Sequence, residues 1–265
     1  MFDNICKFIA ENFRDDLATW LLGSPVPLNV LDPAELAVDP IRADSLIFLQ
    51  SEQLILHTEF QTAPDPDIPF RMLDYRVRLH RRHPRKEARQ VVIYLRPTDS
   101  PLVRQDSFHL RNTSHTFEVI RLWEQPTESF FSLPGLLPFA VLSDTDNPEQ
   151  VLTRVSRSLE SLSPNRVKSN LAAASSILAG LVLNREIIDR ILRSDIMRES
   201  VIYQRILEEG REEGREEGEA RGREEKARQI ARKMFLAGFS IEEIARLTDL
   251  SPAMLEDLQR QSRER

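Results

Sequence analysis

Two short apolar runs separated by a polar break constrain the fold most strongly. Ser45–Leu49 and Leu54–Gln61 flank the polar residues Gln50–Gln53, and this pattern predicts a β-hairpin. Side chains alternate between the two faces of a strand. One face of the second strand therefore ends in an acid and an amide, Glu59 and Gln61, while its other face is apolar and is expected to join the core.

The predicted hairpin brings two acids together. A turn of two residues, or of four beginning at Gln50, places Asp44 opposite Glu59. Opposed residues of antiparallel strands have Cβ atoms about 4.5–5.5 Å apart, and like charges there are destabilising unless they are compensated. A hard divalent cation with oxygen ligands would compensate them, so this pairing predicts an Mg2+ or Mn2+ site.

Two other arrangements of these acids are compatible with the sequence. A turn of three or five residues would shift the register by one and separate them. Asp44 could also cap the entry to its strand while Glu59 lies on a solvated face.

Asp44, the hairpin and Glu59-Phe60-Gln61 resemble the motif of PD-(D/E)XK nucleases, with Gln61 in the position that lysine usually holds. A longer ordered set of segments resembles the Rpn family of recombination-promoting nucleases and transposases. This set is Arg42-Ala43-Asp44, His57-Thr58-Glu59-Phe60-Gln61, Pro64-Asp65-Pro66-Asp67, Arg71-Met72-Leu73-Asp74-Tyr75-Arg76 and Val91-Val92-Ile93-Tyr94-Leu95. The resemblance covers about residues 1–145, and the Glu-Glu-Gly-Arg repeats of the tail are also similar to members of that family.

The resemblance implies Mg2+-dependent hydrolysis of DNA phosphodiester bonds. Asp44, Glu59 and the backbone carbonyl of Phe60 would hold the metal, and Gln61 would complete the catalytic set in place of lysine. An amide donates hydrogen bonds but carries no charge, so Arg71 is a candidate for the missing positive charge. The resemblance also implies that the first helix can supply a further acid, for which Glu11 is the candidate; the alternative is a solvated Glu11.

The resemblance implies an α/β fold: a PD-(D/E)XK restriction-endonuclease-like core, in which helices flank a mixed sheet, followed by an all-α C-terminal region. Apolar periodicity by itself supports a mixed α/β core. It predicts a helix over 4–22, a strand buried on both faces at Val91–Leu95, and a further strand at Phe117–Trp123. Helices are expected at 148–162, 166–183, 185–193 and 195–209.

A helix after the hairpin carries a dense set of cations. Residues 71–96 hold nine Lys or Arg against two acids, although the net charge of the chain is −6. Pro69 suits the first turn of this helix, and Phe70, Leu73 and Val77 are predicted to face inward, with Met72 and Leu79 at the flanks. The residues predicted to contact DNA phosphates are Arg71, Tyr75, Arg78 and Arg82. The alternative is a solvated basic face.

Four parts are predicted along the chain: a nuclease-like domain (1–145), a helical support region (146–207), a Glu/Gly/Arg repeat helix or linker (208–226) and a small helix-turn-helix-like unit (227–265). Ser240 and Glu243 form a capping box in the last part. The C-terminal helical region is a candidate for homo-oligomer formation, for packing or for DNA reading.

Composition narrows the class of protein. A single cysteine among 265 residues rules out an internal disulfide or a Cys-built zinc site. The sequence offers no apolar run of about 18 residues and no signal-peptide pattern, so we expect a cytoplasmic protein that acts on DNA away from membranes. The competing hypothesis is a protein that keeps the nuclease fold but only binds DNA or assembles.

Overall fold

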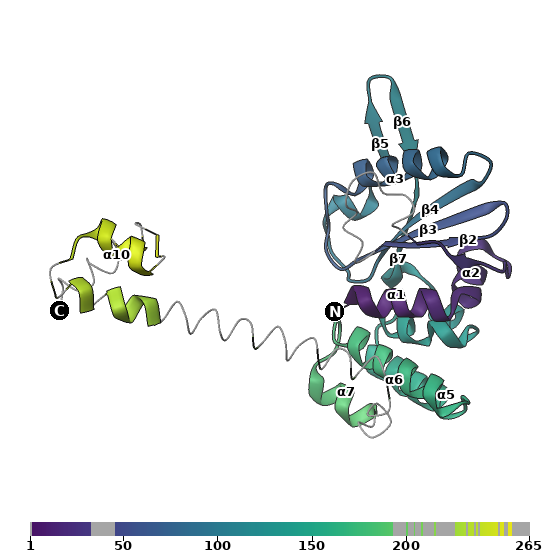
Figure 1. Ribbon diagram of the computed structural model, residues 1–265. Helices are drawn as coiled ribbons and strands as arrows, with labels where there is room; N and C mark the ends of the chain where they lie inside the picture. Colours follow the sequence, from purple (N-terminus) through teal and green to yellow (C-terminus); the bar gives the residue numbers. More distant parts are fainter. Residues whose placement is uncertain are drawn as a thin grey trace. The chain divides into compact units, whose positions relative to one another are not determined.

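The computed structural model (Figure 1) describes residues 2–32, 46–192 and 200, together with single residues and short runs between 204 and 255. The chain divides into two compact units, Met1–Gln204 and Arg205–Arg265. The region 146–207, predicted as a separate support, therefore belongs almost entirely to the first unit. Most of the 208–226 repeat and of the predicted helix at 195–209 lies outside the described residues.

The first unit is a mixed α/β structure built on a five-stranded sheet. In sheet order its strands are β1 (Asn29–Val30), β2 (Leu46–Gln50), β3 (Leu54–Gln61), β4 (Glu87–Tyr94) and β7 (Glu118–Arg121). The first three are antiparallel neighbours, whereas β3, β4 and β7 run parallel. Helix α3 (Ile68–Arg82) connects β3 to β4. The predicted mixed α/β core, the hairpin and the buried strand at Val91–Leu95, which corresponds to the end of β4, are confirmed.

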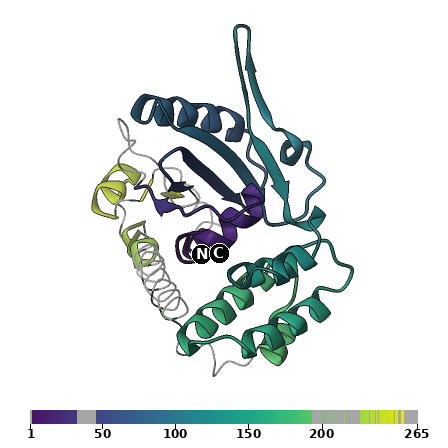
Figure 2. The same cartoon turned by 90° about the vertical axis from the view of Figure 1, so that its right-hand side faces the viewer.

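Helices cover both faces of the sheet (Figures 1 and 2), with α3 on one face and α1 (Phe2–Asn12) on the other. The apolar 3-10 segment η4 (Pro134–Leu142) is buried on the α1 side, where Phe139 stacks on Phe60 with ring centroids 5.7 Å apart. The remaining elements of this unit are α2 (Arg14–Leu22), η2 (Pro101–Arg104), β5 (Ser107–Leu110), β6 (Thr113–Thr116), η3 (Leu122–Glu124), α4 (Glu128–Phe131), α5 (Pro148–Glu160), α6 (Asn165–Ala179) and α7 (Arg185–Ile191).

The hairpin has a different register from the predicted one. Gln50 pairs with Ile55, and Leu46 pairs with Glu59. The turn occupies 51–54 rather than 50–53 because the Ser51 hydroxyl accepts hydrogen bonds from the backbone N–H groups of Gln53 and Leu54. Moving the turn by one residue moves the pairing by two, so the prediction that Asp44 lies opposite Glu59 is wrong. Asp44 itself lies outside the described residues.

The inward face of α3 also differs from the prediction. Ile68, Met72, Tyr75 and Leu79 are buried, whereas Phe70 and Val77 are 59% and 49% exposed. The Tyr75 ring packs edge-on against Phe48 and His57, with centroids 6.0 and 5.1 Å away. These contacts with the sheet, which the helix sequence does not contain, decide the rotation of the helix.

Capping residues fix the ends of two helices. Gly23 caps α2 in the left-handed conformation, with φ of 76°, and Asn147 caps α5 by accepting from the backbone N–H of Gln150. The predicted helix 4–22 is instead two helices that break at Phe13. The hairpin β5–β6, which projects past α3 in Figure 1, has no counterpart among the predicted elements.

The second unit contains α10 (Ile241–Thr248). Ser240 Oγ accepts from the backbone N–H of Glu243, and the Glu243 carboxylate accepts from that of Ser240, so the capping box is confirmed. In neither unit does the described part of the chain contain a helix long and apolar enough to cross a membrane.

Candidate functional site

Polar side chains meet where β3 and β4 end. Glu59 and Gln61 come from the end of β3, and Arg71 comes from the start of α3. Tyr94 is the last residue of β4 and is paired with Gln61 across the parallel strands. In open α/β sheets ligands bind outside the carboxyl ends of the parallel strands, so this end of the sheet is the candidate site.

Arg71 holds two carboxylates. Its Nη2 lies 2.8 Å from Glu59 Oε1 and 2.9 Å from Asp65 Oδ2, and Gln61 Nε2 donates to the same Glu59 oxygen at 2.9 Å. The Glu59 side chain is 2% exposed, whereas those of Arg71 and Asp65 are 34% and 32% exposed. The cluster is therefore buried at Glu59 and open to solvent at Arg71 and Asp65.

The environment of Glu59 favours its protonated form. Burial raises the pKa of this carboxyl to about 7, and the nearby Asp65 adds to the rise, although Arg71 and the Gln61 hydrogen bond oppose it. A buried carboxylate is stabilised by whatever positive charge reaches it. A cation close to Glu59 would therefore stabilise its carboxylate form.

A second buried polar contact fixes this part of the sheet. Gln90 Nε2 donates to His57 Nδ1 at 2.9 Å and to the backbone carbonyl of Met72 at 2.8 Å. Because the amide nitrogen is a donor, His57 Nδ1 accepts and its proton lies on Nε2. Burial, followed by the positive charge of Arg71, lowers the pKa of His57 to about 3. His57 is thus a neutral link between β3, β4 and α3.

The residues predicted to bind phosphate are helically spaced along one side of α3 but differ in exposure. Arg71 is in the carboxylate cluster, and Tyr75 is 5% exposed within the core. Arg78 donates to Asp74 Oδ2 at 2.9 Å, whereas Arg82 is exposed. Because Tyr75 packs against the sheet, only part of the predicted row is open to solvent, and its contact with DNA phosphates stays a prediction.

The additional acid Glu11 is half-buried on α1, the helix on the opposite face of the sheet from α3 (Figure 1). Glu59 faces α3, so the structure places the two acids on different sides of the sheet. Nothing in the described contacts brings Glu11 to the cluster.

The predicted metal ligands fit a divalent cation in part. Glu59 Oε2 is buried and has no hydrogen-bond partner among the described residues. Within the same residues, however, no group of three His, Cys, Asp or Glu is arranged to hold a metal ion. Asp44, the other predicted side-chain ligand, lies outside the described residues. The available donors are oxygens, which suit Mg2+.

Tyr94 belongs to the site but was not predicted from the sequence. Burial raises its pKa to about 12, and the carboxylates of Glu59 and Asp65 add to the rise. The sequence did contain a signal, since a tyrosine inside an apolar strand usually needs a partner for its hydroxyl.

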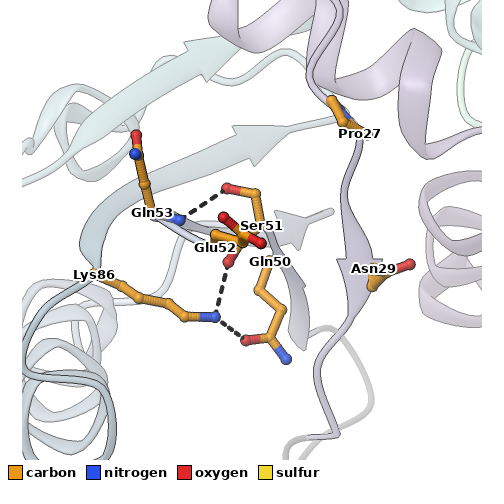
Figure 3. A pocket seen from close by; sticks show the side chains of 7 residues that line it. All are labelled: Pro27, Asn29, Gln50, Ser51, Glu52, Gln53 and Lys86. Carbon is orange, nitrogen blue, oxygen red and sulfur yellow. Dashed lines mark hydrogen bonds between the residues drawn. The ribbon is translucent and has the colours of Figure 1, made fainter.

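An open pocket of about 630 Å³ lies at the other end of β3 (Figure 3). It is lined by the β2–β3 turn, Pro27, Asn29 and Lys86. Lys86 Nζ donates to Gln50 Oε1 and to the Ser51 carbonyl, so the lysine fastens the turn to the start of β4. None of the predicted site residues that the structure describes lines this pocket.

Comparisons with family models, curated proteins and solved structures found no match to this chain. The candidate site is therefore defined by the residues and distances described above.

Proposed function

We propose that this protein is a metal-dependent DNA endonuclease of the PD-(D/E)XK type, related to the recombination-promoting, transposase-like nucleases. The observation that carries the proposal is an oxygen of buried Glu59 that has no partner among the described residues. It lies beside Arg71, at the carboxyl ends of two parallel strands. The order of elements also supports it: a helical layer, an antiparallel meander, a crossover helix and a parallel strand.

In this proposal Glu59, Asp44 and the Phe60 carbonyl would hold Mg2+ or Mn2+. A bound cation of this kind polarises a phosphate and lowers the pKa of water. Gln61 holds the Glu59 carboxylate in place through its amide N–H and keeps a second N–H to donate. Arg71 supplies the positive charge that glutamine lacks.

A specific observation favours a second candidate, a nuclease-fold protein that binds DNA or assembles without cutting. Arg71 already bonds to both Glu59 and Asp65, so these carboxylates are compensated by the chain's own cation. Such compensation would preserve the fold whether or not a metal binds.

One experiment separates the two candidates. The full chain is incubated with supercoiled plasmid and with circular single-stranded DNA in Mg2+, in Mn2+ and in EDTA. The proposal expects cleavage with either metal and none in EDTA. DNA that is bound but left intact under all three conditions would favour the second candidate.

Arg82 provides a test of DNA contact away from the chemistry. It is exposed and lies eleven residues beyond Arg71, about 16 Å along the helix, so it would meet a different phosphate. We expect Arg82→Ala to weaken DNA binding several-fold on every sequence and to reduce the salt slope of binding by about one.

Fluorescence anisotropy at several salt concentrations measures this effect. Arg185→Ala is the matched control, because Arg185 is a 91% exposed arginine of α7. A loss confined to some DNA sequences, or an unchanged salt slope, would contradict the phosphate contact.

A further inference from the structure

Tyr94 is held in the candidate site by its ring. It ends β4, paired with Gln61, and its ring packs with Ile68, Met72 and Val92 beneath α3. The residue is 2% exposed. Paired residues of neighbouring strands point to the same face, so Tyr94 lies on the face that also carries Glu59 and Gln61.

Besides Glu59 Oε2, the oxygen assigned to the proposed metal, two polar atoms of this site lack partners among the described residues. The Tyr94 hydroxyl and Arg71 Nε are both buried, and neither has a hydrogen-bond partner among the described residues. Buried polar groups in folded proteins nearly always have a partner, because leaving one unpaired costs free energy. An arginine N–H can only donate, and a tyrosine hydroxyl can donate. The site therefore offers two donors to an acceptor from outside the described residues.

We propose that Tyr94 and Arg71 together bind a non-bridging oxygen of the DNA phosphodiester, which makes Tyr94 a substrate-binding residue. This assignment rests on the proposed function for the identity of the substrate. An anionic phosphate oxygen is the acceptor that two such donors bind most strongly. Arg71 is one-third exposed, so the anion reaches the donors from the solvent side of the cluster.

The test compares Tyr94→Phe with the wild-type full chain. The substitution removes only the hydroxyl and keeps the ring in its packing. Affinity for a fluorescent 20-base-pair duplex is measured by anisotropy in Ca2+, a cation that shares the preference of Mg2+ for oxygen ligands, so that binding is observed apart from turnover.

We expect Tyr94→Phe to weaken binding at least about tenfold, the effect of losing one hydrogen bond to a charged group. The factor should be the same at every salt concentration, because a neutral hydroxyl displaces no counterion from DNA. The melting temperature of the free protein should not fall, since none of the described residues bonds to the lost hydroxyl.

Thr58→Val is the matched control. Thr58 carries another buried hydroxyl with no partner among the described residues, but it lies on the opposite face of β3 from Glu59. This variant should bind DNA like the wild type.

Two results would overturn the assignment. Unchanged DNA affinity in Tyr94→Phe, whatever its melting temperature, would show that the hydroxyl does not bind substrate. Wild-type protein that binds no DNA would also overturn it, because DNA would then not be the substrate. By contrast, wild-type protein that binds DNA without cutting it would contradict the proposed nuclease activity. The effect of Tyr94→Phe on DNA binding could still be measured.

Discussion

Glu59→Gln should lower the rate of Mg2+-dependent DNA cleavage by at least about 100-fold, since a catalytic cation contributes several kcal/mol to the barrier. Glutamine has the same shape, and its carbonyl oxygen can still accept from Arg71 and Gln61 as Glu59 Oε1 does. What it loses is the negative charge on the unpartnered oxygen. The fold should therefore survive while the affinity for the cation is lost.

The comparison requires a matched acid in the same sheet. Glu118 of β7 is bonded to Arg89, and its side chain is 48% exposed. Glu118→Gln should cleave DNA at the wild-type rate, whereas Asp44→Asn should lose cleavage activity as Glu59→Gln does. If Glu59→Gln cleaves at the wild-type rate under initial-rate conditions, the assignment of the metal site is wrong.

The metal-free protein should lose about 3 kcal/mol of stability through Glu59 as the pH rises from about 4.5 to 7. Burial raises the folded-state pKa of this carboxyl from 4.5 to about 7. The folded state then binds the proton more tightly than the unfolded state, so the stability contribution is complete below pH 4.5. It declines as the pH passes through the folded-state pKa.

Urea unfolding in EDTA between pH 4.5 and 8 measures this change. His57 is neutral in the folded state, with a pKa of about 3, so it lowers the stability as the pH falls below about 6.5. This effect is the same in the wild type and in Glu59→Gln. The difference between wild type and Glu59→Gln isolates Glu59. The variant should match the wild type at pH 4.5 and exceed its stability at pH 8; two parallel curves would contradict the raised pKa.

The sequence was sufficient to predict the sheet but not its register. The apolar runs of β2, β3 and β4 identify strands because they are short, rich in β-branched residues and bounded by polar residues. The register depends on which polar residue opens the turn, and the hydroxyl of Ser51 selects 51–54. Every residue from Gln50 to Gln53 is polar, so hydropathy alone could not distinguish the two turns.

The buried face of α3 and the contacts within the site could likewise not be predicted from the sequence alone. On α3 the apolar residues Phe70, Leu73 and Val77 are helically spaced, and so are the residues that the structure buries, Met72, Tyr75 and Leu79. Only the fit of Tyr75 against His57 and Phe48 distinguishes these faces. Glu59 was found from its neighbours in the chain. The ion pair with Arg71, twelve residues away, depends on where the crossover helix begins.

The bond from Arg71 to two carboxylates couples a helix to a strand and a loop. Arg71 belongs to α3, Glu59 to β3 and Asp65 to the segment between them. A small displacement of the first turn of α3 would change the distance from the guanidinium to both acids at once. A molecule that binds the outer surface of this helix and displaces it would thereby change the ion pairs of both carboxylates. Ligand binding and the chemistry of the site would then depend on the position of the same helix.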